Sequence, residues 1–163
     1  MFVGQILYFN KRGKDEMEDI KNVAKYFLAK ESMTHKKLQK LCYYAQAWYY
    51  AITNTPLVDT EFEAWVHGPV APVLYHEYKQ WGWLNIPSEP KGIEAISDQV
   101  KKSILEAVYS VYGGLTGDQL EQLTHEQEPW QRAREGYRPS EYCRNNIDLE
   151  LMKKSCYDEM KKQ

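Results

Sequence analysis

The sequence predicts a mainly α-helical protein that folds as one compact domain around a central apolar helix. Three observations support this prediction. Residues 34–52, THKKLQKLCYYAQAWYYAI, are apolar around most of a helical circumference. Several other segments repeat apolar residues at the three- and four-residue spacing of a helix face. The 163 residues also suit a single domain with a sizeable core. We therefore expect the remaining segments to pack around the central helix.

Thr34 is the expected N-cap of the central helix, because its hydroxyl can accept a hydrogen bond from a first-turn amide. Lys36, Lys37 and Lys40 are interpreted as one solvated side of the opening turns. After Leu41, apolar residues cover most of the helix circumference, so we expect few positions to face water. Aromatic residues at helical spacing usually belong to a core, so we interpret those of this helix as packing residues. The expected apolar face consists of Leu38, Leu41, Cys42, Ala45, Trp48, Tyr49 and Ile52.

Further helices are predicted from apolar spacing and from capping or helix-ending residues. They run over about 19–30, from Pro69 or Pro72 to 82, from Ser97 or Asp98 to 112, over 117–123 and 129–135, and from Asn146 or Asp148 to 160. Residues 61–66 alternate apolar and polar side chains, which predicts a short β element and the only one expected. Residues 85–96 read as a surface loop because of their Pro, Ser and Gly content. We predict an N-terminal extension or arm over residues 1–18 and the helical domain over 19–163.

The amino-acid composition of the chain argues against nucleic acid and membranes as partners. The formal net charge of -2 gives no reason to expect nucleic acid or an anionic membrane as a partner. No apolar run approaches the length of a membrane span, and the first residues lack the basic start of a secretory signal. We therefore expect a cytoplasmic protein with no membrane partner. Three cysteines far apart fit reduced thiols better than disulfides. The 13 Tyr and 5 Trp suit both cores and protein interfaces.

No catalytic, metal or cofactor site is predicted. None of the four histidines has metal-binding spacing, and no glycine-rich phosphate loop is present. Cys42 lies on a face predicted to be buried, where a thiol is inert. Carboxylates such as Glu61 and Glu126 could pair for acid and base chemistry, but their spacing does not bring them together. We interpret them as solvated charges.

Two turns, WVHGPV and LTHEQEPW, each join a His, a Trp and a Pro in a short non-helical stretch. Loops held by a rigid scaffold often present binding groups, so a partner could dock on a face that these turns form or support. The alternative is a structural corner, which Gly68 and Pro69 shape and in which both histidines donate to nearby carbonyls. The partner-binding candidates are Trp65, His67, Tyr75, Tyr78, Trp81, His125 and Trp130.

Three runs in order, KLQKLCYYAQAWYYAI, FEAWVHGPVAPVLYHEY and GDQLEQLTHEQEPWQRAR, carry a resemblance to a known family. The chain resembles the Panacea domain, also called the SocA-like or GepA-like phage-associated domain, over about residues 19–134. The resemblance implies a mostly helical antitoxin, found among other places in prophages, that neutralises a protein toxin encoded beside it by direct contact. No DNA-binding helix-turn-helix module is recognisable beside the domain, so the resemblance does not extend to promoter autoregulation.

The expected function is therefore that of the antitoxin in a toxin-antitoxin pair, with a cognate protein toxin as its partner. Two alternatives stay open. One branch of the family hands its toxin to a cytoplasmic protease, so the chain could be a proteolytic adaptor or another phage-encoded interaction protein. An enzyme of unknown class is the second alternative, and it would need a pocket in which His and Glu side chains converge.

Overall fold

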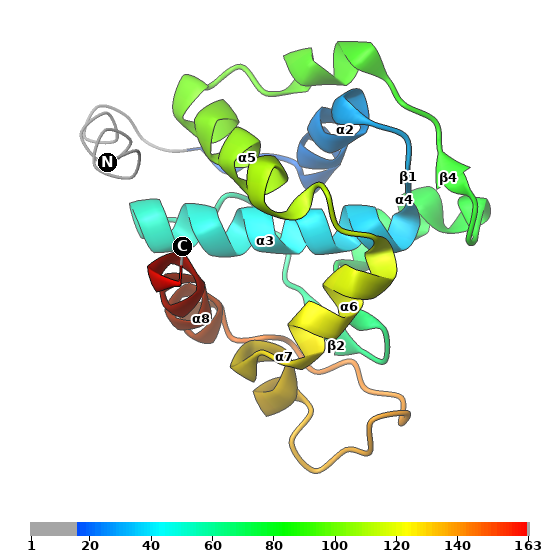
Figure 1. Cartoon of the computed structure of the whole chain (residues 1–163), viewed down its shortest axis with the longest axis vertical. Coiled ribbons are helices and arrows are strands. Elements are labelled where there is room, and N and C mark those ends of the chain that lie inside the picture. Colours follow the sequence, from blue (N-terminus) through cyan, green and yellow to red (C-terminus); the bar gives the residue numbers. More distant parts are fainter. Residues whose placement is uncertain (1–15, 163) are drawn as a thin grey trace.

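A computed structural model of the chain describes residues 16–162 (Figure 1). The helices are α2 (Ile20–Lys30), α3 (His35–Thr53), α4 (Pro72–Tyr78), α5 (Gln99–Tyr112), α6 (Gly117–His125), α7 (Glu128–Ala133) and α8 (Leu149–Lys161). The 3-10 helices are η1 (Lys79–Trp81) and η2 (Pro90–Ala95). The strands are β1 (Met33–Thr34), β2 (Glu63–Trp65), β3 (Gly68–Val70) and β4 (Asn85–Ile86). The prediction of a mainly α fold is confirmed. The predicted arm over residues 1–18 lies almost wholly outside the described residues.

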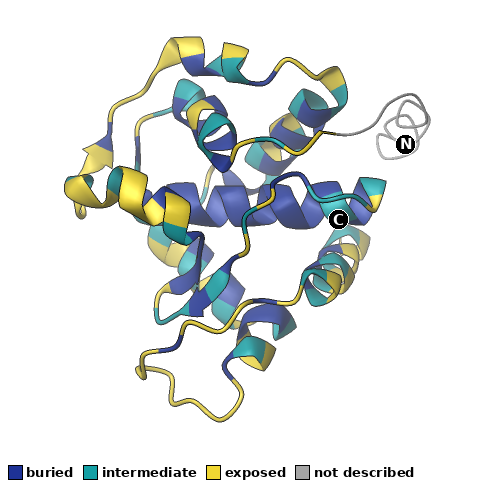
Figure 2. Ribbon diagram, turned by 180° about the vertical axis from the view of Figure 1, so that it is seen from behind, coloured by how far each residue is buried: buried dark blue, intermediate teal, exposed yellow. Residues whose placement is uncertain are grey.

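Helix α3 is the centre of the fold, as predicted. Its 19 residues are buried nearly throughout, and Figure 2 shows it as the dark blue element that crosses the molecule. Thr34 caps its start by accepting a hydrogen bond from Lys37 N at 3.2 Å. Asn54, with a left-handed φ of 59°, ends it. Helices α2, α5, α6 and α8 pack against α3, so its apolar circumference is covered on several sides.

The prediction that the lysines of the first turns of α3 are solvated is wrong for Lys37 and Lys40. Lys37 Nζ donates to Gly113 O at 2.6 Å and pairs with Glu31 at 2.8 Å. Lys40 is buried, and its Nζ donates to Pro69 O at 3.2 Å. Strand β3 and the turn after α5 cover this end of α3, so both side chains reach backbone carbonyls instead of water.

The predicted β element at residues 61–66 is confirmed as β2, which forms an antiparallel hairpin with β3. The registered pairs are Glu63 with Val70, Ala64 with Pro69 and Trp65 with Gly68. The tight turn between the strands follows from Gly68, whose φ of +101° disfavours a residue with a side chain. The hairpin places the WVHGPV turn beside the first turns of α3.

The prediction of a simple surface loop over residues 85–96 is wrong. Strand β4 pairs antiparallel with β1, and η2 packs against α2. The backbones of η2 and α2 are in close contact, because a Cβ on Gly92 would lie 2.1 Å from Lys25 O. Ile86 and Ile96 are buried in the main core, and their burial explains why a segment rich in turn residues is ordered against the domain.

The chain returns to the hairpin after α7. Arg134 is buried and donates from Nη1 to Ala64 O at 2.7 Å and from Nη2 to Arg138 O at 2.9 Å. Ile147 N donates to Phe62 O at 2.8 Å. These bonds hold the segment between α7 and α8 against β2. Within residues 16–162, no helix combines the length and apolar character needed to cross a bilayer.

Candidate partner-binding groove

A groove of about 380 Å³ opens between the start of α3, the β2–β3 hairpin and the α4–η1 segment. Its volume falls within the roughly 300–1,000 Å³ typical of ligand sites. The groove is lined by His35, Lys36, Gln39, Lys40, Trp65, His67, Val70, Tyr75, Lys79, Gly82 and Trp83. The lining thus combines aromatic rings with basic side chains.

Aromatic rings make the walls of the groove. Tyr75 lies edge-on to Trp65, with ring centroids 5.0 Å apart, and it stacks on His35 at 5.6 Å. His67 lies edge-on to Trp83, with ring centroids 6.2 Å apart. Trp83 is 74% exposed, whereas Tyr75 is 36% exposed. Aromatic pairs at these separations hold one another in place, so the walls are partly pre-organised.

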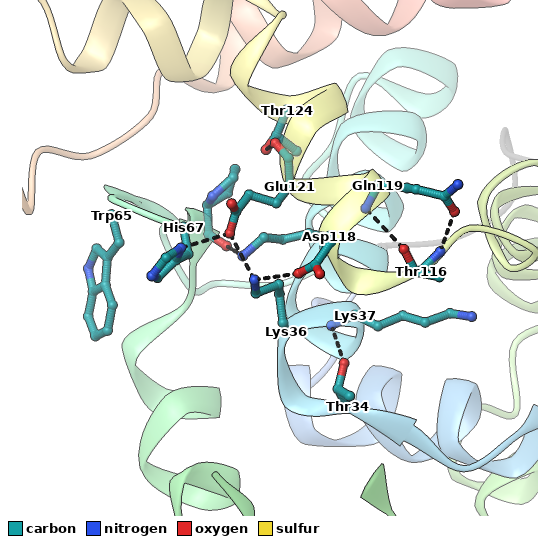
Figure 3. A network of polar contacts seen from close by, with 12 residues as sticks. Thr34, Lys36, Lys37, Trp65, His67, Thr116, Asp118, Gln119, Glu121 and Thr124 are labelled. Carbon is teal, nitrogen blue, oxygen red and sulfur yellow. Dashed lines mark hydrogen bonds and ion pairs between the residues drawn. The ribbon is translucent and has the colours of Figure 1, made fainter. Parts of the chain in front are cut away.

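Ion pairs join the rim of the groove to α6 (Figure 3). Lys36 Nζ lies 2.8 Å from Asp118 Oδ1 and 3.0 Å from Glu121 Oε1. His67 Nδ1 lies 2.9 Å from the same Glu121 oxygen. The Lys36 ammonium also lies 5.3 Å from the ring centroid of Trp83. Lys36 is therefore tied both to α6 and to the wall of the groove.

A capping box positions the acidic residues of this network. Thr116 Oγ1 accepts from Gln119 N at 3.1 Å, and Gln119 Oε1 accepts from Thr116 N at 2.9 Å (Figure 3). Because α6 begins at this box, Asp118 and Glu121 lie three residues apart on one helix face. Both carboxylates can then reach Lys36.

The floor of the groove contains two buried basic groups with lowered pKa values. Burial lowers the pKa of Lys40 to about 7. Burial, and then the nearby Lys40 charge, lower the pKa of His35 to about 4. Gln39 holds this floor to β3, because its Oε1 accepts from Ala71 N at 2.9 Å. At neutral pH the imidazole is therefore neutral and the ammonium is only partly ionised.

The structure brings three of the seven predicted site residues together, since Trp65, His67 and Tyr75 all line the groove. Tyr78 and Trp81 are instead partly buried and pack against the hydrophobic core. Although both follow Tyr75 on the same segment, they face inward and serve the fold. The partner-binding role of all seven residues stays a prediction.

His125 and Trp130 lie behind the hairpin and outside the groove lining. Their rings stack with centroids 3.9 Å apart, and Trp130 Nε1 donates to Trp65 O at 2.9 Å. His125 is hydrogen-bonded to the backbone of Val66, which partly offsets the lowering of its pKa by burial. The structural-corner alternative therefore describes His125 well. His67 differs from that alternative, because its partner is the Glu121 carboxylate and not a carbonyl.

The sequence reasoning missed several residues that line the groove, and Trp83 is the most exposed aromatic residue among them. It follows Gly82, whose φ of +55° ends η1 in a turn, and it precedes Leu84, which is 71% exposed. A signal was present in the sequence, because the Trp follows a glycine that ends the predicted helix and so stands at a turn, where binding groups are often presented.

His67 and Glu121 form the kind of His–Glu pair that the enzyme alternative requires. Partial burial alone would raise the pKa of Glu121, but Lys36 and His67 hold it below its ordinary value. A carboxylate held ionised by two basic neighbours is a weak proton acceptor, so the pair is better suited to an ion-pair network than to general base catalysis. Across residues 16–162, no three His, Cys, Asp or Glu side chains are grouped as they would be around a metal ion.

Fold and groove together describe a small, mainly α-helical domain that presents an aromatic and basic groove beside a β-hairpin. The chain belongs to the family described as Antitoxin SocA-like, Panacea domain, which matches residues 38–131. This match confirms the resemblance indicated by the three sequence motifs, and it includes most of α3, the hairpin and α6.

A comparison with curated proteins finds the same family. Antitoxin SocA of Caulobacter vibrioides (strain NA1000 / CB15N) is 38% identical to this chain over 74 residues, which are 45% of this chain and 35% of that protein. The similarity thus spans about a third of the length of that relative. No solved structure matches the chain.

Proposed function

We propose that this protein is an antitoxin that neutralises a cognate protein toxin by forming a stoichiometric complex with it. Family membership supports the antitoxin role, because residues 38–131 match an antitoxin SocA-like domain. The relative in Caulobacter vibrioides is likewise named as an antitoxin. Neutralisation by direct binding needs a contact surface, and the groove is the best candidate for it.

The observation that carries the proposal is the set of aromatic side chains around the groove. We call Trp65, His67, Tyr75 and Trp83 the aromatic face. Trp and Tyr are enriched among the residues that contribute most to protein interfaces. An indole as exposed as that of Trp83 contributes little to the core, so a partner is the simplest reason for its position.

A protein partner also fits the electrostatics better than nucleic acid does. The formal net charge is -2, whereas nucleic-acid-binding domains usually carry a strong excess of positive charge. The lysine at the rim, Lys36, is already paired with Asp118 and Glu121. Little free positive charge is left there for a phosphate backbone.

The test is co-expression of this protein with the product of the adjacent gene. We expect the neighbour to stop growth when it is expressed alone, and we expect growth and a co-purifying complex when both are expressed. Trp83→Ala and Tyr75→Ala should each weaken the complex by roughly tenfold or more. Tyr137→Ala, which removes an exposed aromatic side chain from the segment after α7, is the matched control and should bind normally.

Two results would reject direct neutralisation. The first is a neighbour that is harmless by itself. The second is rescue of growth with no complex under any condition. Rescue that disappears when a cytoplasmic protease is deleted, together with a fall in the toxin level, would instead favour the proteolytic adaptor.

A further inference from the structure

The floor of the groove contains a buried ammonium with hydrogen-bonding capacity to spare. A protonated lysine has three N–H donors. Among the described residues, Lys40 Nζ donates one hydrogen bond, to Pro69 O at 3.2 Å. The side chain is only 1% exposed, yet it lines the groove. Lys40 therefore keeps donors at the floor of the groove that the fold leaves unused.

The lining of the groove contains no Asp or Glu. His35 is neutral at neutral pH, and Lys36 is paired with Asp118 and Glu121. The positive charge available to an anionic occupant therefore comes from Lys40 and from the exposed Lys79. Glu121 is the nearby carboxylate that acts on Lys40, but its Oε1 already binds Lys36 and His67. Burying an ammonium without a full set of partners is costly, and an incoming carboxylate would offset that cost.

The aromatic walls favour an occupant that has apolar groups next to its anionic group. Trp65, Tyr75 and Trp83 present ring surface to the groove, and Val70 adds an aliphatic side chain. A free inorganic anion would leave these rings uncovered. A short peptide segment can satisfy the floor and the walls together, since one side chain can reach inward while its neighbours cover the rings.

We propose that the groove is the subsite of the toxin interface that takes an acidic side chain of the toxin flanked by aromatic or aliphatic residues. The carboxylate accepts a hydrogen bond from Lys40 Nζ, and the flanking side chains pack on Trp65, Tyr75 and Trp83. This assignment rests on the proposed function for the identity of the partner. The chemistry of the site itself depends only on the groove.

The assignment can be tested without knowing the toxin. The probe is the capped pentapeptide Gly-Phe-Asp-Phe-Gly at millimolar concentration, compared with Gly-Phe-Asn-Phe-Gly, which has the same shape without the charge. Binding is followed by NMR of the ¹⁵N-labelled full chain, through the indole N–H signals of Trp65 and Trp83. The indoles of Trp48 and Trp130, which donate to Tyr112 Oη and Trp65 O, are internal references for folding.

We expect saturable shifts of the Trp65 and Trp83 signals with the Asp peptide and binding of the Asn peptide that is about fivefold weaker or more. Lys40→Met retains an unbranched side chain without the charge and should abolish the difference between the peptides. Lys91→Met, which changes an exposed residue of η2, should leave the difference unchanged. Should Lys40→Met fail to fold, Trp83→Ala alters only an exposed wall and should weaken both peptides.

Equal binding of both peptides to the wild type would overturn the assignment, and so would an Asp preference that survives Lys40→Met. Shifts with adenosine monophosphate but with neither peptide would make the groove a small-anion site and would also overturn it. The two proposals fail separately. An Asp preference without rescue of growth rejects the antitoxin and keeps the subsite, whereas rescue without an Asp preference does the reverse.

Discussion

Gly68 packs directly against the side chain of Lys40 where the β2–β3 hairpin crosses α3. A Cβ on Gly68 would lie 2.7 Å from Lys40 Cε and 2.9 Å from Thr124 Oγ1. The Lys40 side chain passes directly under the turn and donates to the next carbonyl, that of Pro69. This contact limits how closely the hairpin can approach α3. It thereby helps to position Trp65 and His67 on the hairpin.

Gly68→Ala should therefore destabilise the protein by roughly 1–3 kcal/mol, because alanine meets both a close contact and a φ of +101° that disfavours it. Urea unfolding measures the change. Gly114→Ala is the control, since a Cβ there has no neighbour within 4 Å, and it should change stability by less than about 0.5 kcal/mol. Equal effects at both positions would show that the contact with Lys40 is unimportant.

The lowered pKa of Lys40 predicts a rise in stability with pH. Its pKa is about 7 in the folded chain, against an ordinary value of 10.5. Between these values the unfolded chain binds a proton that the folded chain does not, so the free energy of unfolding increases with pH. The increase should reach about 1 kcal/mol per pH unit between pH 7 and 9.5, below the ionisation of tyrosine.

Lys40→Met should lack this rise, and the difference between the two unfolding curves isolates the contribution of Lys40. Other charged groups act on this site as well. Glu121 raises the pKa of Lys40 and Lys36 lowers it, whereas Lys40 itself lowers the pKa of His35 and His125. Parallel curves for the wild type and the variant would mean that Lys40 keeps an ordinary pKa in the folded protein.

Because α3 is central, a cavity beside it should strongly lower the free energy of unfolding. Leu41 is fully buried, so Leu41→Ala should lower the free energy of unfolding by about 2–5 kcal/mol. Trp48→Ala should have an effect of the same order, because the indole is buried and hydrogen-bonded to Tyr112. Leu84→Ala makes the same chemical change at an exposed position and should have little effect. Wild-type stability in Leu41→Ala would remove α3 from the centre of the fold.

Substitution of Arg134 should loosen the segment between α7 and α8. Its guanidinium donates to carbonyls of β2 and of the following segment, so Arg134→Met should cost about 2 kcal/mol or more. The segment between α7 and α8 should then be cut faster by a protease. Arg132→Met removes an exposed arginine that pairs with Glu128 and is the matched control. Unchanged cleavage in Arg134→Met would show that Arg134 does not hold the segment.

The sequence by itself determined the helical layout. The N-cap of α3 at Thr34 and the apolar stripe of the central helix follow from residues a few positions apart. For α5 and α8 the sequence left two candidate caps each, and the structure uses Asp98 and Asp148. Such local signals survive in isolation, because capping and helical periodicity depend on neighbours along the chain. The family resemblance had the same origin, in three short runs that keep their order.

Only the tertiary structure decided which of these residues meet. Lys40 is charged and was therefore expected in water, but a hairpin about thirty residues further along the chain covers it and supplies its acceptor. Tyr75 and Tyr78 are three residues apart, yet one lines the groove and the other packs on the core. Trp83 contacts His67, sixteen residues earlier in the chain. Burial and charge pairing depend on surfaces brought together from distant segments, and no local pattern in the chain specifies them.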